Sequence, residues 1–492
     1  MSSKLFVICI GGSGAKCFEA ITHLAAAGLY SEQAIEVLFV DPDEANGSME
    51  RARRSLSVYQ QCQQLVGGGD RQVSTPWMQT PIKSHDLWSP FADRPFNREL
   101  ASFFEYNSIR SNDESLANLF DVLYSPEERV QQLDEGFRGR PSIGAAVMSQ
   151  IDLEQLDRAP WGSIIQEIKN ASGGGNTARV LLCGSIFGGT GASGIPTIAR
   201  LLRNKFEKEG IQNSARLGGL FLLPYFSFTV PPGANTNGIY ASADQFLLNT
   251  EAALRYYVTQ ASSLFDTVYL LGNEDTSKVE FSVGKRTQQN RPHFIELYAA
   301  LAARDFLFQD RKDELMLVAR ASGGLLDWND LPEASTVKKS LINGSRLAYL
   351  WLSDIQEELE SIRNARGLPP WASPFYESVA GNPLKLDTET QQSALKIINS
   401  WSQDYLRWLQ DIHQCDTDRV RLFNTQVFGN AGNQLPKEKL SDIAIGDPRD
   451  PKAKQKQDGI AWIKEDLRRK QNFDSRRGTV GLATSLYLNI SL

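Results

Sequence analysis

The residues with the clearest chemical potential lie in a glycine-rich loop at positions 188–194, Gly-Gly-Thr-Gly-Ala-Ser-Gly. An apolar run at 180–183 precedes the loop and predicts a buried strand, and apolar residues at helical spacing follow it. Pro196 is expected in the first turn of that helix, where proline is tolerated. Because glycines let the backbone approach a ligand and a helix start presents unpaired N–H groups, the pattern is typical of a phosphate site. Its candidate ligand-binding residues are Gly188, Gly189, Thr190, Gly191, Ala192 and Ser193.

A second glycine turn follows the first predicted strand, at 4–10, and also suits phosphate. The next predicted strand, at 35–40, ends at Asp41 and Asp43, which flank a proline. Carboxylates at the carboxyl end of a strand beside a phosphate loop are well placed to hold Mg²⁺ directly or through water. The alternative is that this acidic turn only caps the next helix. The residues of the glycine turn are Gly11, Gly12, Ser13, Gly14 and Ala15.

The predicted strands and helices that carry these loops alternate along the chain. Such an alternation predicts an α/β fold with a mainly parallel sheet that helices cover on both faces. In sheets of this kind ligands bind at the carboxyl ends of the strands, which is where each loop lies. The strands are predicted at 4–10, 35–40, 180–183, 217–223 and 267–271.

The remaining segments are less regular. A long helix at 292–309 is apolar on most sides and is expected to be buried, with His293 either near the ligand or satisfied in the core. Residues 48–135 have poor periodicity and indicate an insertion of short helices and loops. The region 340–475 is predicted to be mostly helical, and alternating apolar residues at 480–492 predict a terminal strand.

Composition excludes several classes of protein. The chain has 492 residues, of which 41% are hydrophobic and 22% charged, as in an ordinary globular protein. A net charge of -6 argues against a protein that binds nucleic acid through overall positive charge. Five scattered cysteines and four histidines offer no zinc-ligand spacing. No apolar run reaches the roughly 18 residues of a membrane span, and no leader pattern is present, so a cytoplasmic protein is expected.

Two common nucleotide-binding patterns are disfavoured. Positions 189–194 match the dinucleotide pattern, but the next strand ends Leu222-Leu223-Pro224, without the acid that would hold the ribose. The first glycine turn has Cys17 in place of its third glycine, although Asp41 could serve as its acid. No stretch shows the P-loop spacing of two glycines followed by lysine and a hydroxyl residue. A plain NAD-dependent enzyme and a P-loop NTPase are therefore poor fits.

Taken in order, the loops resemble those of the tubulin/FtsZ superfamily, as in a divergent bacterial member. Residues 188–194 resemble its phosphate-binding signature loop, 11–14 its first phosphate loop, and 37–43 the tubulin segment whose acid approaches magnesium. The segment with Gly139 and Arg140 resembles the FtsZ loop that senses the γ-phosphate. Residues 226–228 match the segment after the following strand, and Asn273-Glu274 matches the pair at which tubulins read guanine.

One further segment, Leu326-Asp327-Trp328-Asn329-Asp330, resembles the FtsZ catalytic loop. The resemblance implies that Asp327 and Asp330 reach into the nucleotide site of the next subunit and position the hydrolytic water. The chain departs from the family at Leu325, where the catalytic loop usually carries asparagine two positions before its first acid. The predominantly helical pattern at 340–475 also differs from the mixed sheet-and-helix domain of the family.

The resemblance implies a tubulin-like nucleotide-binding domain at 1–285, a central helix at 286–310, and a smaller C-terminal α+β domain at 311–492 with the catalytic loop at 323–332. It also implies binding of GTP or GDP with Mg²⁺, slow hydrolysis, and head-to-tail self-association into oligomers or filaments. The alternative hypothesis, motivated by Leu325, is a nucleotide-binding interaction module that joins a multiprotein complex without turnover.

Overall fold

A seven-stranded parallel sheet forms the centre of the molecule, in the order β3-β2-β1-β4-β5-β7-β9. The computed structural model describes residues 4–31, 33–67, 75–91, 98–229, 243–282, 285–311, 314–320, 324–362, 369–376, 386, 388–428, 440–447, 458–469 and 478–492. The predicted α/β fold with a parallel sheet is confirmed. The strands are β1 (Lys4–Ile10), β2 (Ile35–Val40), β3 (Ile82–Trp88), β4 (Ala178–Ser185), β5 (Ala215–Leu222), β7 (Thr267–Asn273) and β9 (Glu314–Arg320).

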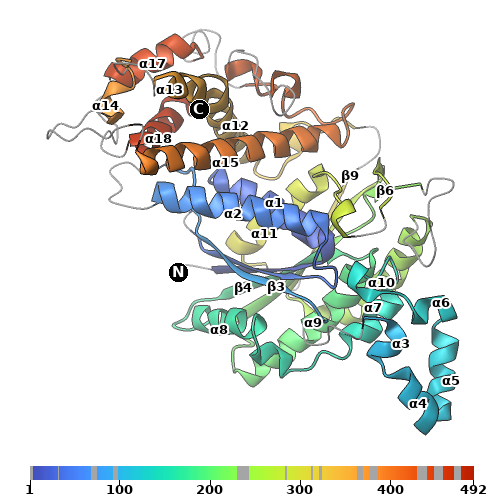
Figure 1. The fold of residues 1–492 in the computed structure, drawn as a ribbon. Coiled ribbons are helices and arrows are strands. Elements are labelled where there is room, and N and C mark those ends of the chain that lie inside the picture. Colours follow the sequence, from blue (N-terminus) through green and yellow to red (C-terminus); the bar gives the residue numbers. More distant parts are fainter. Residues whose placement is uncertain are drawn as a thin grey trace.

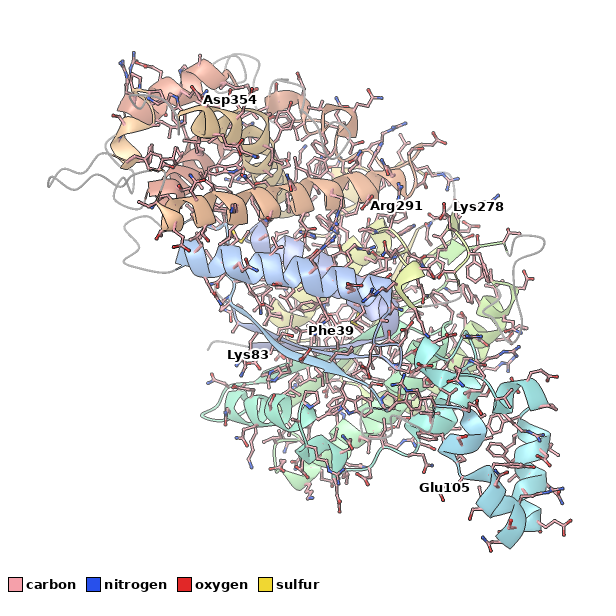
Figure 2. The ribbon with its side chains drawn as sticks, in the orientation of Figure 1. Phe39, Lys83, Glu105, Lys278, Arg291 and Asp354 are labelled. Atoms are coloured by element: carbon pink, nitrogen blue, oxygen red, sulfur yellow. The ribbon has the colours of Figure 1, made fainter. Side chains whose placement is uncertain are left out.

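Helices cover both faces of this sheet, which separates two apolar clusters (Figure 1). In β1, Leu5, Val7 and Cys9 face one cluster, and the intervening residues face the other, as the two-residue period of a strand requires. Figure 2 shows Phe39 of β2 deep between the layers. The first face carries α1 (Gly11–Ala26), α2 (Gly47–Gly67) and α11 (Phe294–Phe308), and the second carries α7 (Pro141–Met148), α8 (Trp161–Ala171), α9 (Gly189–Lys208) and α10 (Asp244–Leu264).

Glycines allow the two helices nearest the centre to approach the strands. A Cβ atom added to Gly14 of α1 would lie 2.4 Å from the carbonyl oxygen of Cys183, and one added to Gly191 of α9 would lie 2.2 Å from that of Ser185. No larger residue fits at these contacts without moving the backbone. Because α9 begins inside the glycine loop, Pro196 lies within the helix and not in its first turn, so that prediction is wrong.

The predicted insertion at 48–135 is wrong in its first half, because α2 and β3 belong to the core. β3 is an edge strand with several exposed residues, so its sequence lacks the apolar run of the inner strands. The second half is an insertion of short helices that projects from the body, with Glu105 on the projection (Figures 1 and 2). These helices are α3 (Leu100–Phe103), α4 (Tyr106–Asn112), α5 (Glu114–Leu123) and α6 (Pro126–Arg129).

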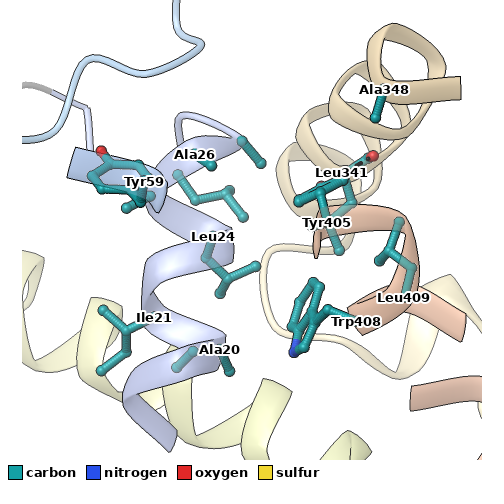
Figure 3. Close-up of a cluster of buried hydrophobic side chains, with 14 of the residues drawn as sticks. Ala20, Ile21, Leu24, Ala26, Tyr59, Leu341, Ala348, Tyr405, Trp408 and Leu409 are labelled. Carbon is teal, nitrogen blue, oxygen red and sulfur yellow. Dashed lines mark hydrogen bonds between the residues drawn. The ribbon is translucent and has the colours of Figure 1, made fainter. Parts of the chain in front are cut away.

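A third layer of helices lies over α1 and α2 (Figure 1). Figure 3 shows Leu24 of α1 across from Tyr405 and Trp408 of this layer, and His23 of α1 stacks on Trp408 with ring centroids 4.7 Å apart. The same apolar cluster therefore continues from the sheet into this layer. The layer contains α12 (Ala334–Leu350), a π-helical turn (Trp351–Ile355), α13 (Gln356–Ile362), α15 (Glu389–Gln414), α17 (Ile460–Arg469) and α18 (Gly478–Ile490).

The predicted terminal strand at 480–492 is wrong, because these residues belong mainly to α18. Residues 478–487 are all buried, and a helix buried on every side shows the same apolar run as a buried strand, which periodicity cannot distinguish. The α+β prediction for 311–492 is also wrong in the described part. Its strand β9 belongs to the central sheet, and the described residues after it form helices and isolated bridges. Across the described chain, no helix is long and apolar enough to cross a bilayer.

Candidate functional site

A cleft opens where the sheet reverses its direction of winding. The chain passes from β1 outward to β2 and β3, and then from β4 outward in the opposite direction through β5 and β7 to β9. The junction of β1 and β4 is thus the topological switch point, beside which doubly wound sheets bind ligands. The cleft has a volume of about 1130 Å³, including solvent space at its mouth. Predicted site residues that line it are Gly11, Gly12, Ser13, Asp41, Asp43, Gly139, Gly188, Gly189, Thr190 and Gly191.

The two glycine turns lie against each other at this cleft, and the loop with Phe137 lies against the second of them. A Cβ atom added to Gly11 would lie 3.3 Å from Cβ of Thr190, and one added to Gly189 would lie 2.9 Å from Cβ of Phe137. The turns lead directly into α1 and α9, whose N-cap residues, Ile10 and Gly188, provide no side-chain cap. The first-turn N–H groups of two helices therefore converge on one cleft, which suits an anion with several oxygens.

Asp41 is the clearest candidate for contact with a cation. Its side chain is 2% exposed, and Oδ1 accepts a hydrogen bond from the backbone N–H of Asp43 at 3.0 Å. Oδ2 is buried, and no hydrogen-bond donor among the described residues reaches it. Burial raises the pKa of Asp41 well above its ordinary value. A buried carboxylate oxygen without a donor at a cleft is suited to a cation, which would supply the missing positive charge.

Asp43 holds the loop rather than leaving an oxygen for a ligand. Oδ1 accepts from the backbone N–H of Ala45 at 3.1 Å, and Oδ2 accepts from the backbone N–H of Lys285 at 2.8 Å. Burial nevertheless raises the pKa of this carboxyl group. The turn after β2 is thereby tied to the segment that precedes α11. No cluster of three or more His, Cys, Asp or Glu residues suited to a metal occurs in the described parts of the chain.

Lys16 brings a positive charge to the wall of the cleft, one turn into α1. Its ammonium group forms a buried ion pair with Glu296 of α11, and Nζ lies 3.5 Å from the hydroxyl oxygen of Tyr225. The Tyr225 hydroxyl donates to Glu296 Oε1 at 2.8 Å. Burial raises the pKa of Tyr225, so the hydroxyl remains a donor. The cleft is therefore linked to the central helix through charge.

The first turn of α11 is fixed by a reciprocal cap. Nδ1 of His293 accepts from the N–H of Ile295 at 3.1 Å, while Glu296 Oε2 accepts from the N–H of His293 at 2.9 Å. Burial lowers the pKa of His293 well below its ordinary value, so the ring is neutral. Because Nδ1 accepts, Nε2 carries the proton and donates to Ser277 Oγ at 2.9 Å. His293 is thus a satisfied core residue, and it does not line the cleft.

One wall of the cleft is aromatic and another carries amides. Phe187 and Phe246 contact each other with ring centroids 4.8 Å apart, and Phe226 lies 5.8 Å from Phe246 by the same measure. Asn46 Nδ2 donates to Gln288 Oε1 at 3.2 Å on another part of the lining. A flat heterocycle could stack on the aromatic wall while amides contact its polar edge.

No protein-family model matches this chain, and no curated protein matches it.

Four predicted residues of the glycine turns do not line the cleft. Gly14 allows α1 to contact β4, and Ala15 is buried beside it. Ser193 Oγ donates to the carbonyl oxygen of Gly189 at 2.7 Å, which holds the first turn of α9 together. Ala192 is half-buried and does not line the cleft. Gly14, Ala15 and Ser193 therefore support the loops from behind.

Arg140 and Asn273 also lie outside the lining. The Arg140 guanidinium lies 3.8 Å from Glu128 of α6, whereas Arg138 of the same loop lines the cleft. The side chain of Asn273 donates to the carbonyl oxygen of Asp275 at 2.5 Å. The predicted roles of Arg140 at a γ-phosphate and of Asn273 at a base therefore find no support in this geometry.

Asp327 and Asp330 lie on an exposed turn and do not line the cleft. Asp327 Oδ1 accepts from the N–H of Asn329 at 2.7 Å, and Asp330 Oδ2 accepts from the N–H of Asp327 at 2.8 Å. The hydroxyl of Tyr298 in α11 donates to the carbonyl oxygen of Asp330 at 2.8 Å. The two acids therefore cap their own turn, and one oxygen of each carboxylate remains outside the reciprocal cap.

Sequence reasoning missed several lining residues. Lys16 follows the first glycine turn directly, so its position one helical turn into α1 was a usable signal. Asn46 follows the acidic turn and could also have been considered. By contrast, Phe246, Gln288 and Asn290 come from segments far along the chain, and no local pattern marks them.

Proposed function

We propose that the chain binds GTP with Mg²⁺ in this cleft and hydrolyses it slowly upon self-association. The observation that carries the proposal is the convergence of two uncapped helix starts, after β1 and β4, beside the unpartnered oxygen of Asp41. The helix starts suit an anion, and the carboxylate suits a cation. A magnesium–polyphosphate ligand contains both and would satisfy the two groups at once. The choice of guanine rests on the resemblance to tubulin and FtsZ.

Different lining residues would bind different parts of the ligand. Backbone N–H groups of the two glycine turns would hold the phosphates, with Lys16 supplying positive charge. Asp41 would hold the metal ion, and Asp43 would keep the loop in place. Bound there, Mg²⁺ would neutralise charge on the terminal phosphates. Because carboxylates outnumber basic groups in the lining, a polyphosphate without a cation would be repelled. The carboxylates are Asp41, Asp43, Glu135 and Glu280, and the basic groups are Lys16 and Arg138.

Hydrolysis on this proposal needs a second subunit. Asp327 and Asp330 are exposed and lie outside the lining of their own cleft, so they would act on nucleotide held by a neighbour. There they would orient the attacking water, which is the step that the protein must supply in phosphoryl transfer to water. A head-to-tail arrangement repeats this contact from one subunit to the next.

A second candidate function is a nucleotide-binding interaction module without turnover. The favouring observation is that both acids are engaged in capping their own turn, and that Leu325 precedes them where asparagine is usual. On this reading the nucleotide would stabilise a conformation that a partner protein recognises.

Turnover measured against protein concentration separates the two. For the wild type we expect GTP turnover per subunit to rise steeply with concentration. Asp327→Asn and Asp330→Asn retain a capping oxygen but remove the charge, so turnover should fall by about 100-fold or more while GTP binding persists. Asp113→Asn is a matched control, because Asp113 is an exposed helix N-cap on the projecting insertion.

Mixing variants tests catalysis in trans directly. Asp41→Asn damages the cleft and Asp330→Asn damages the exposed turn, so a mixture should recover turnover that neither variant has alone. Tight GTP binding with flat, negligible turnover in the wild type would favour the non-hydrolysing module. Binding of NAD but not GTP would overturn both functions.

A further inference from the structure

A second polar cluster lies away from the cleft, between the strands β2 and β3 and the start of α8. His85 of β3 and Glu36 of β2 are buried, whereas Ser163 in the first turn of α8 is exposed. His85 Nε2 is hydrogen-bonded to Glu36 Oε2, and His85 Nδ1 is hydrogen-bonded to Ser163 Oγ. None of the three residues lines the nucleotide cleft. One imidazole thus connects a buried carboxyl group to a serine at the surface.

A β-bulge places His85 on the side of the sheet that carries α8. Within its pairing with β2, β3 has one extra residue, and Asp86 adopts a left-handed φ of 72°. His85 and Trp88 can therefore lie on the same face, although residues three apart in a regular strand lie on opposite faces. Trp88 packs against Trp161 of α8 with ring centroids 5.8 Å apart. The bulge and this aromatic contact together hold the imidazole beside the start of α8.

The charge on Glu36 decides which nitrogen of His85 carries the proton. Burial by itself would raise the pKa of Glu36, but hydrogen bonds from His85 and Lys4 lower that pKa below its ordinary value, so the carboxylate is ionised at neutral pH. An ionised carboxylate can only accept, so His85 Nε2 carries a proton and donates it to Glu36. In the neutral ring Nδ1 is then the acceptor, and the Ser163 hydroxyl donates to it. A histidine in this position can take the proton from a serine nucleophile.

We propose that Ser163, His85 and Glu36 form a second active site, which hydrolyses carboxylic esters of small acyl groups. Ser163 Oγ attacks the acyl carbon while His85 Nδ1 accepts the hydroxyl proton, and this proton leaves with the alcohol when the ester C–O bond breaks. Water then attacks the acyl-serine with His85 as the base, which releases the carboxylic acid and restores the hydroxyl. Ser163 and His85 are the catalytic residues, and Glu36 is a positioning residue.

The start of α8 supports the charge that develops in this reaction. α8 begins at Trp161 without a side-chain cap, and Ser163 lies in its first turn. The positive end of the helix dipole therefore lies beside the hydroxyl, where it favours negative charge on the attacked ester oxygen. Because Ser163 is at the surface, a small ester can reach it without entering a deep acyl pocket.

A fluorophosphonate tests the nucleophile, because it phosphonylates serines that an adjacent base activates. In the full chain without nucleotide or Mg²⁺, we expect one adduct per chain, which peptide mass spectrometry should place on Ser163. Ser163→Ala removes only the hydroxyl of an exposed side chain, so it should abolish the adduct with an unchanged circular dichroism spectrum. Ser263→Ala is the matched control, because Ser263 is also an exposed helical serine but its hydroxyl donates to the carbonyl oxygen of Gln260 at 2.8 Å. This control should be labelled as the wild type is.

Hydrolysis of p-nitrophenyl acetate separates the roles of the other two residues. His85→Gln should lower kcat by about 1000-fold or more, because the base is lost. Glu36→Gln should also lower kcat by about 1000-fold with KM unchanged, because its amide can donate to Nε2 and so move the ring proton to Nδ1. A purely structural Glu36 would instead change the unfolding midpoint and leave kcat as it is.

Several outcomes would overturn the proposal. These are a wild type that forms no adduct, an adduct on a residue other than Ser163, and equal kcat for Glu36→Gln and the wild type. Because both assays are run without nucleotide, none of these outcomes bears on the GTPase proposal, and a failure of GTP binding would leave the esterase site untouched.

Discussion

At Asp41, the features that suit the proposed cation lower the stability of the ligand-free protein. The side chain is buried, one of its oxygens lacks a donor among the described residues, and burial raises the pKa of the carboxyl group. The folded chain therefore holds this proton more tightly than the unfolded chain, whose pKa is near 3.8. Stability consequently falls as pH rises from about that value toward the raised folded pKa. A bound cation would remove this cost, because it favours the ionised form.

Asp41→Asn should stabilise the ligand-free protein at neutral pH. The amide avoids a buried charge while its oxygen still accepts from the N–H of Asp43. In urea unfolding with chelator, we expect a gain of about 1 kcal/mol or more at pH 8 and a smaller difference at pH 5. The variant should also lose the Mg²⁺-dependent part of GTP binding.

Asp43→Asn provides the matched control for this prediction. Both Asp43 oxygens accept backbone hydrogen bonds, so the amide nitrogen would face an N–H group and destabilise the protein by about 1–2 kcal/mol. Equal destabilisation by the two substitutions, at every pH, would show that Asp41 is a structural residue like its neighbour.

At the scale of elements, α11 connects the cleft to the rest of the core. Its N-cap histidine and Glu296 fix the first turn, and Glu296 also pairs with Lys16 at the cleft. The neutral His293 ring accepts from Ile295 and donates to Ser277, whose hydroxyl donates to the carbonyl oxygen of Cys415 at 2.9 Å. A ligand that attracts Lys16 would therefore act on a residue that also caps the central helix.

His293→Ala should destabilise the protein through the loss of this cap, by about 1–2 kcal/mol at pH 7.5. The pKa of His293 is lowered in the folded state, so the wild type is fully stabilised above the ordinary pKa of 6.5 and loses stability as pH falls below it. The alanine variant should lose less stability over the same range. Parallel pH profiles for the two proteins, measured by denaturant unfolding, would contradict this role.

For the molecule as a whole, the apolar core does not stop at the sheet. One cluster extends from the strands through α1, α2 and α11 into α12, α15 and α18. Tyr405 and Trp408 of α15 contact α1, the helix that carries the first glycine turn (Figure 3). The C-terminal helices therefore support the first glycine turn from behind, and the cleft depends on packing far from its lining.

Because the cluster is continuous, we expect one cooperative unfolding transition for the central sheet and the C-terminal helices. Circular dichroism and tryptophan fluorescence should give coincident curves. Trp408→Ala should lower stability by about 3–5 kcal/mol and weaken GTP binding, since it removes the support of α1. Trp462→Ala, at a partly exposed position of α17, should change stability by less than about 0.5 kcal/mol. Two separate transitions would show that the C-terminal helices fold independently.

Local sequence patterns were sufficient to predict most strands of the central sheet. Apolar runs bounded by turns predicted β1, β2, β4, β5 and β7, and parallel winding then required their loops to share one edge. The glycine turns and Asp41 could be identified because each acts within a few residues of a strand end. The edge strand β3 was not predicted, because its exposed polar residues interrupt the apolar run of a buried strand. The helix α18 was predicted as a strand, because a helix buried on every side lacks the periodicity of an amphipathic helix.

Contacts between segments far apart in the chain could be identified only from the folded structure. The pairing of Lys16 with Glu296 and the lining contributed by Gln288 and Asn290 join residues far apart in the chain. The separation of Asp327 and Asp330 from the cleft is likewise visible only in the folded structure. Sequence periodicity reports which face of an element is apolar, because that is a local property of spacing. It does not report which other element meets that face, since the meeting is decided by packing across the whole core.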